Sequence, residues 1–238
     1  MARDRAAGAG RPLAHPGTLR RQARMKHIDF YLDFISPYAH LAFEHLPQAL
    51  EGLSCSVAYK PVLLGAILKH HGQLGPAEIP AKRSWTYRHV LWLGHANGIQ
   101  IEMPASHPYN PLPHLRLALS TSDDGSISRL VAETILRNVW RGGEEAGDSA
   151  RLAALAAQLE PKRDMNGDEN KALLKRNTDE ALQLGVFGTP TCRVDGRLFW
   201  GFDGLAMLRA YLAGDAWFDG PQWAAADQRP SLLRSSKS

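Results

Sequence analysis

The chain has 238 residues, of which 44% are hydrophobic and 22% are charged. A chain of this length and composition can bury a sizeable core without disulfides or metal, as one domain or as one domain with a large insertion. The net charge is +4, but residues 1–24 hold six arginines and one aspartate, so the rest carries 4 − 5 = −1. The basic charge belongs to the N-terminal segment, and the body of the chain shows no nucleic-acid-binding pattern.

Residues 1–24 are rich in arginine and poor in acids, which is a composition similar to that of a mitochondrial transit peptide. The segment has one threonine and no serine, however, and glycine and proline are scattered through it. We therefore expect residues 1–24 to be a disordered extension upstream of a start at Met25.

The two cysteines, Cys55 and Cys192, lie far apart and form neither a CxxC motif nor a metal-ligand cluster. No histidine pattern indicates a metal site either. No apolar stretch is long enough to span a bilayer, and residues 1–24 lack the apolar centre of a secretory signal. These features predict a reduced, cytoplasmic protein with no metal and no membrane partner.

The first elements form a β-α-β unit. Residues 27–34 (HIDFYLDF) are β-branched and aromatic and predict a buried strand. Ser36 suits the N-cap and Pro37 the first position of a helix that continues through 39–50. Residues 53–62 alternate in hydropathy and predict a second strand, parallel to the first.

The middle of the chain has helical periodicity and no strand-like run between about residues 65 and 185. The expected helices cover residues 80–98, 111–122, 127–143, 148–159 and 168–185.

A β-hairpin follows, with strands 191–194 and 197–200 joined by Asp195-Gly196. Residues 203–214 predict a last helix, and residues 215–238 a loose tail. The two strand-rich ends should pair, which gives an α/β fold: a four-stranded mixed sheet flanked by helices. The expected division is 25–65 with 185–214 for the sheet domain and 66–184 for an all-helical insertion.

Three motifs carry a family resemblance: DFISPYAH (33–40), VFGTPT (186–191) and LFWGFDGL (198–205). Over residues 26 to 213 the chain resembles the DsbA-like branch of the thioredoxin fold. More narrowly, it resembles the 2-hydroxychromene-2-carboxylate isomerases, which are allied to kappa-class glutathione transferases. The resemblance implies a thioredoxin-like fold, glutathione as the cofactor and a homodimer.

Ser36 and Ala39 stand where thiol oxidoreductases of this fold have the two cysteines of Cys-Pro-His-Cys. Disulfide exchange needs a protein thiolate, so we do not expect this chain to catalyse it by that route. Ser36 alone is explained as a helix cap. The resemblance implies a second, compatible role, in which Ser36 and the helix amides hold the glutathione sulfur as a thiolate.

The resemblance places a cis-proline at Pro190, opposite the active-site helix, and implies that Thr189 pairs with the cysteinyl backbone of glutathione. An ordinary trans proline at the start of a strand is the alternative. The resemblance also places the γ-glutamyl end of glutathione at the turn formed by Trp200, Gly201, Phe202 and Asp203. Asp203 could instead be the N-cap of the last helix, and Phe202 departs from the small or polar residue of the family pattern.

Candidates for binding a second substrate, a small aromatic carboxylate, lie in the helical insertion: Lys69, Lys82, Tyr87, Tyr109 and Asn110. A cation would hold the carboxylate and a tyrosine a phenolic oxygen, although exposed lysines and packed tyrosines are common without any such role.

The leading hypothesis is a glutathione-dependent isomerase of the 2-hydroxychromene-2-carboxylate type, acting in aromatic-compound breakdown. The alternatives are a kappa-like glutathione transferase, which would use the same site, and a non-catalytic DsbA-like binding module.

Overall fold

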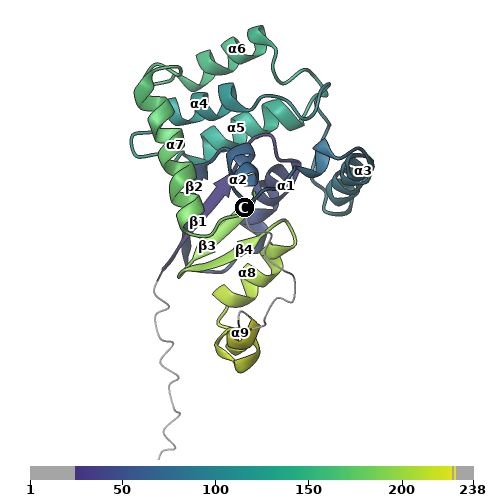
Figure 1. The fold of residues 1–238 in the computed structure, drawn as a ribbon, viewed down its shortest axis with the longest axis vertical. Coiled ribbons are helices and arrows are strands. Elements are labelled where there is room, and N and C mark those ends of the chain that lie inside the picture. Colours follow the sequence, from purple (N-terminus) through teal and green to yellow (C-terminus); the bar gives the residue numbers. More distant parts are fainter. Residues whose placement is uncertain (1–24, 227, 229–238) are drawn as a thin grey trace, which may run out of the picture.

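A computed structural model describes residues 25–226 and 228 (Figure 1). The predicted extension 1–24 lies outside the described residues. The strands are β1 (Lys26–Leu32), β2 (Cys55–Pro61), β3 (Thr191–Val194) and β4 (Arg197–Trp200). The helices are α1 (Pro37–Ala49), α2 (Leu64–His70), α3 (Pro80–Ala96), α4 (Leu112–Ser120), α5 (Arg129–Trp140), α6 (Ser149–Leu159), α7 (Asp168–Gln183), α8 (Gly204–Leu212) and α9 (Pro221–Ala226), with short 3₁₀ helices η1 (Pro76–Glu78) and η2 (Ala216–Asp219).

The four strands form one mixed sheet in the order β2-β1-β3-β4. β1 and β2 are parallel and joined through α1, whereas β3 is antiparallel to both β1 and β4. The sheet therefore combines the β-α-β unit with the hairpin, and it confirms the predicted α/β fold class.

The second half of strand β1 is buried on both faces of the sheet, which explains the apolar run from Phe30 to Leu32. Phe30 belongs to the main core, which also includes residues of α1, α4, α5 and α8. Its neighbour Tyr31 points the other way, into a smaller core with Ile67 of α2 and Ala181 of α7. This alternation is the period of two that side chains follow along a strand.

Helices α4, α5 and α6 gather beyond one end of the strands, α7 runs from them past the strands, α3 projects from the side, and α8 and α9 lie at the opposite end (Figure 1). Buried side chains of α4, α5, α6 and α7 join the same hydrophobic cluster as those of the strands. Among the helices of residues 25–226, none has the length and apolar character needed to cross a bilayer.

The expectation of a loose tail from residue 215 is wrong for its first part. Asp215 caps η2 by accepting a hydrogen bond from the Trp217 amide at 2.9 Å. Phe218 of η2 is only 3% exposed, in the main core. The Arg197 guanidinium lies 5.4 Å from the Trp223 ring centre and donates to the Phe218 carbonyl at 2.9 Å. These long-range contacts order the segment that local composition marks as polar and loose.

Candidate active site

Ser36 lies at the junction between β1 and α1. It is the N-cap of α1, and its Oγ accepts a hydrogen bond from the Ala39 amide at 3.2 Å. The same hydroxyl donates to the Thr189 carbonyl at 3.2 Å. Pro37 occupies the first turn, where it has no intrahelical amide bond to lose. Ser36 therefore caps the helix and also contacts the loop that precedes β3.

The strand register explains why Thr189 lies opposite Ser36. β1 and β3 are antiparallel, with Tyr31 paired to Thr191. Moving forward from Tyr31 and backward from Thr191 along the two strands leads to the Ser36 turn and to Thr189. The Thr191 hydroxyl donates to the Gly188 carbonyl at 2.7 Å, which holds this loop in shape. The Thr189–Pro190 peptide bond is cis, as the resemblance implied.

The Thr189 hydroxyl is a second polar group at this junction. Its Oγ1 is buried and has no hydrogen-bond partner among the described residues. A buried hydroxyl without a partner is costly, because it has lost its bonds to water.

The turn after β4 contacts the same loop. The Gly201 amide donates to the Pro190 carbonyl at 2.9 Å. Gly201 has φ +88°, a left-handed conformation that glycine adopts without strain. A Cβ at this position would lie 2.5 Å from an oxygen of Asp203, so a larger residue would have to displace that carboxylate. The turn thus brings Asp203 and the Thr189-Pro190 loop together.

Asp203 occupies the N-cap position of α8, but its side chain accepts no capping hydrogen bond. The carboxylate is exposed. Burial raises the pKa of Tyr38, and the negative charge of Asp203 raises it further. Tyr38 lies two residues after Ser36, and its hydroxyl is 2.9 Å from Nδ1 of His89 on α3. The capping explanation of Asp203 is therefore incomplete, and its carboxylate remains open toward the start of α1.

The other residues of the predicted turn present aromatic surface. Trp200 is 54% exposed, and its ring packs against Phe187 with 5.1 Å between centres. Phe202 is half-buried and packs against the His45 ring of α1 at 5.4 Å. The side chain of Phe202 thus contacts α1, while Trp200 and Phe187 border the Thr189 loop.

The substrate-binding candidates of the insertion have varied surroundings. Lys69 and Lys82 are exposed, at the end of α2 and the start of α3. The Tyr87 hydroxyl is engaged with His107, and the Tyr109 hydroxyl is buried. Asn110 accepts a hydrogen bond from the Leu112 amide at 3.1 Å, as in a helix-entry turn. Contact of these residues with a substrate stays a prediction.

A buried carboxylate behind the site is a feature that the sequence analysis missed. Asp33 is fully buried and accepts hydrogen bonds from the Leu64 amide at 2.8 Å and the Ile35 amide at 3.2 Å. Burial raises the pKa of this carboxyl to about 7, although the amide bonds oppose the shift. The only signal for this buried carboxylate in the sequence is a polar residue at the end of an apolar run.

Neither cysteine can supply a reactive thiol to this site. Cys192 is buried on β3, where burial raises the pKa of its thiol to about 12. Burial also raises the pKa of Cys55 on β2. A thiol with a raised pKa is a weak nucleophile at neutral pH because little of it is thiolate. Among the described residues, no group of three or more His, Cys, Asp or Glu could hold a metal ion.

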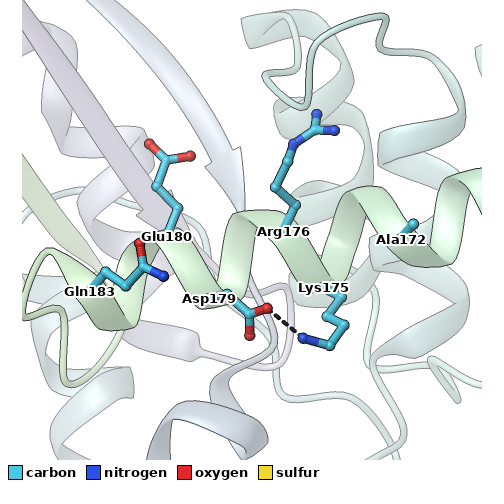
Figure 2. A pocket seen from close by; sticks show the side chains of 6 residues that line it. All are labelled: Ala172, Lys175, Arg176, Asp179, Glu180 and Gln183. Carbon is cyan, nitrogen blue, oxygen red and sulfur yellow. Dashed lines mark hydrogen bonds and ion pairs between the residues drawn. The ribbon is translucent and has the colours of Figure 1, made fainter.

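Two open hollows of the surface lie elsewhere. One of about 350 Å³ is lined by side chains of the exposed face of α7, where Lys175 and Asp179 form an ion pair (Figure 2). A second, of about 370 Å³, lies between α5 and α6. Both are shallow grooves beside charged side chains, and neither is lined by a residue of the Ser36 junction.

The fold and the junction define a thioredoxin-like protein without the paired cysteines. The model of the DSBA-like thioredoxin domain matches residues 27–213, and the chain belongs to that family. The solved structure of a 2-hydroxychromene-2-carboxylate isomerase superposes with a TM-score of 0.69 at 20% identity, covering 86% of this chain and 100% of that one.

Two groups of relatives are similar over most of the chain. A 2-hydroxychromene-2-carboxylate isomerase of Sphingobium xenophagum is 26% identical over 195 residues, 79% of this chain and 98% of that protein. Glutathione S-transferase kappa 2 of Caenorhabditis elegans is 26% identical over 216 residues, 82% of this chain and 95% of that protein. The resemblance expected from the three motifs is thereby confirmed, and the relatives are isomerases and glutathione transferases.

Proposed function

We propose that the protein is a glutathione-dependent isomerase of the 2-hydroxychromene-2-carboxylate type. The observation that carries the proposal is the Ser36 hydroxyl at the start of α1, 3.2 Å from the Thr189 carbonyl, in a chain whose own thiols lie elsewhere. Its relatives include isomerases with this name and kappa-class glutathione transferases. A site with a helix N-terminus and no cysteine is suited to a thiolate supplied by a ligand.

The residues present fit glutathione along its length. The Thr189 carbonyl would accept a hydrogen bond from the cysteinyl amide and so free the Ser36 hydroxyl to donate to sulfur. The open carboxylate of Asp203 would hold the ammonium of the γ-glutamyl end, and Gly201 lets the backbone approach closely.

When bound, glutathione would supply a thiolate nucleophile for the isomerisation, in which the carbon–oxygen bond of the hemiketal ring breaks, the former double bond rotates, and the thiol is released unchanged. The protein would contribute position and charge stabilisation. Ser36 and the first amides of α1 stabilise negative charge on sulfur, because a helix N-terminus carries partial positive charge. Lys69 or Lys82 would bind the substrate carboxylate.

The test compares Ser36→Ala with Ser128→Ala. Both serines cap a helix by accepting an amide hydrogen bond at 3.2 Å, but Ser128 stands at the start of α5, away from the junction. Each variant should lose about 1 kcal/mol of stability with its cap. Only Ser36→Ala should also raise the pKa of the bound glutathione thiol, by about one to two units, because a hydrogen bond to a charged group is worth roughly 1.5–3 kcal/mol.

Thiolate absorbance near 240 nm across a pH series measures that pKa, and calorimetry measures glutathione binding. Equal thiol pKa values in the two variants would leave Ser36 as a cap alone. Absence of glutathione binding by the wild-type protein would exclude both enzyme functions and favour the non-catalytic binding module.

The kappa-class relatives make a glutathione transferase the second candidate. The two activities differ in the fate of glutathione, which an isomerase regenerates and a transferase consumes. Assays with the chromene carboxylate and with an electrophilic aryl halide, each followed by titration of free thiol, separate them. Conversion of the chromene at constant thiol supports the isomerase, and stoichiometric thiol loss with the halide alone supports the transferase.

A further inference from the structure

His107 lies beside the Ser36 turn, although it comes from the loop before α4. Its Nε2 is 2.8 Å from the carbonyl oxygen of Ile35, the residue that precedes Ser36. A carbonyl oxygen only accepts hydrogen bonds, so Nε2 must carry the hydrogen and donate it. The loop before α4 is thus tied to the backbone of the junction.

Tyr87 of α3 holds His107 on its other side. The Tyr87 hydroxyl is 2.9 Å from Nδ1 of His107 and donates to the His107 carbonyl at 2.7 Å. The two rings meet edge to face, with 5.5 Å between centres. Burial lowers the pKa of His107. The hydrogen bond to the Ile35 carbonyl opposes this shift, and the nearby positive charge of Arg83 adds to it. The ring is therefore neutral at neutral pH, with its hydrogen on Nε2.

A second side chain holds the neighbouring carbonyl of the same turn. The indole Nε1 of Trp140, at the end of α5, donates to the Phe34 carbonyl at 2.9 Å. The rings of Trp140 and His107 pack with 5.5 Å between centres. Two donors from the helical insertion thus fix two consecutive carbonyls immediately before Ser36.

We propose that His107 is a positioning residue of the glutathione site, which holds the Ile35 carbonyl through Nε2 and so fixes the direction of the Ser36 hydroxyl and of the first amides of α1. This role rests on the function proposed above. His107 does not touch the sulfur; it acts through the turn. Tyr87 supports this contact by donating its hydroxyl hydrogen to the His107 carbonyl.

Three variants separate positioning from packing. His107→Phe keeps a ring of similar size but removes the donor to Ile35. His107→Gln keeps a donor, because the side-chain nitrogen of glutamine is about as far from the backbone as Nε2. Tyr87→Phe keeps the ring contact but removes the hydroxyl that faces Nδ1. His95→Phe, at an exposed position of α3, is the control.

The first readout needs no ligand. Hydrogen exchange of the Ser36 and Ala39 amides should become about five- to tenfold faster in His107→Phe, as expected for one lost hydrogen bond, and stay near the wild-type rate in His107→Gln. The ring nitrogen chemical shifts of wild-type His107 should report a neutral Nε2–H ring at pH 7. A neutral ring with its hydrogen on Nδ1, or wild-type exchange rates in a folded His107→Phe protein, would overturn the proposal.

The second readout uses glutathione itself. The pKa of the bound thiol should rise in His107→Phe, rise less in Tyr87→Phe, and stay unchanged in His107→Gln and in the control. Equal thiol pKa values in His107→Phe and His107→Gln would refute the positioning role. If the wild-type protein binds no glutathione, the function proposed above fails, while the exchange experiment still decides whether His107 fixes the turn.

Discussion

The Ser36 hydroxyl joins two parts of the chain that are 153 residues apart in sequence. It accepts from the Ala39 amide and donates to the Thr189 carbonyl, so its hydrogen-bonding capacity is largely used before any ligand binds. A ligand amide that takes over the Thr189 carbonyl would release the Ser36 hydrogen. The cap and the site thus depend on the same atom, and replacing Ser36 affects both.

His114 of α4 is a buried residue whose surroundings disfavour its protonated form. The side chain is fully buried, and neither ring nitrogen has a hydrogen-bond partner among the described residues. Burial, with a smaller contribution from the Arg151 charge, lowers the pKa of His114 to about 4. Between this value and the ordinary pKa near 6.5, the unfolded chain binds a proton that the folded chain does not. The stability of the protein therefore falls as the pH drops through this window.

We predict that His114→Leu stabilises the protein, and more so at pH 4.5 than at pH 7.5. Leucine has a similar size and removes both the unpaired nitrogens and the proton uptake on unfolding. The difference between the two gains should be about 2–3 kcal/mol, since a pKa difference of one unit corresponds to about 1.4 kcal/mol. Urea unfolding at the two pH values measures it.

His70→Leu is the control for this prediction, because His70 is exposed at the end of α2. It should leave the pH dependence of the free energy of unfolding unchanged. Equal pH dependence in His114→Leu and in the wild-type protein would mean that His114 is hydrated or protonated in the folded state.

At the scale of single elements, helix α2 shows what local sequence does not reveal. Its N-cap residue, Leu63, makes no side-chain hydrogen bond. The Leu64 amide is instead bonded to Asp33, which lies 31 residues earlier in the chain. Local patterns of capping residues cannot indicate such a partner, because it reaches the helix only once β1 and β2 have paired. The same buried carboxylate then supports the Ser36 turn through the Ile35 amide.

The elements η2 and α9 depend on another distant partner. Arg197 of β4 lies 4.9 Å from the Tyr211 ring centre and 5.4 Å from the Trp223 ring centre, and it bonds to the Phe218 carbonyl. Phe218 packs against the rings of both Phe199 and Tyr211. The polar composition after residue 215 predicted a loose tail because it does not show this aromatic cluster.

We predict that Phe218→Ala lowers the free energy of unfolding by about 3–5 kcal/mol, the usual cost of removing a buried aromatic ring. Trp217→Ala is the matched control: Trp217 neighbours Phe218 but is 47% exposed, so its removal should cost less. Denaturant unfolding of the two variants gives the comparison. A cost for Phe218→Ala no larger than that for Trp217→Ala would mean that η2 is not part of the core in solution.

At the scale of the whole molecule, the order of elements and the three motifs were sufficient to predict the sheet. Hydropathy patterns predict the strands, and the Asp195-Gly196 turn indicates the hairpin. The loops that contain Ser36 and Thr189 could be matched to a family because each is part of a short motif of neighbouring residues. The neighbours that hold these loops, such as His107 and Trp140, could not be predicted, because each contacts the junction from far along the chain.

The sequence analysis divided the chain into a sheet domain and an all-helical insertion of residues 66–184. The two parts share buried contacts, so we expect them to unfold together. One hydrophobic cluster includes Phe30 of β1, Leu117 of α4 and Ile135 of α5. A core shared in this way favours a single cooperative transition. We predict that Leu117→Ala lowers the free energy of exchange of the slowest β1 amides and α5 amides equally, by about 2–5 kcal/mol.

Native-state hydrogen exchange measures both sets of amides in one experiment. Leu130→Ala is the control, because Leu130 lies on α5 but is 68% exposed, and it should change neither set. If Leu117→Ala destabilised the α5 amides alone, the insertion would unfold independently of the sheet. The loops around Ser36 would then lose the support of Trp140 and His107 whenever the insertion opened, and glutathione binding would be coupled to that opening. Equal destabilisation instead means that the donors behind Ser36 are lost only when the whole protein unfolds.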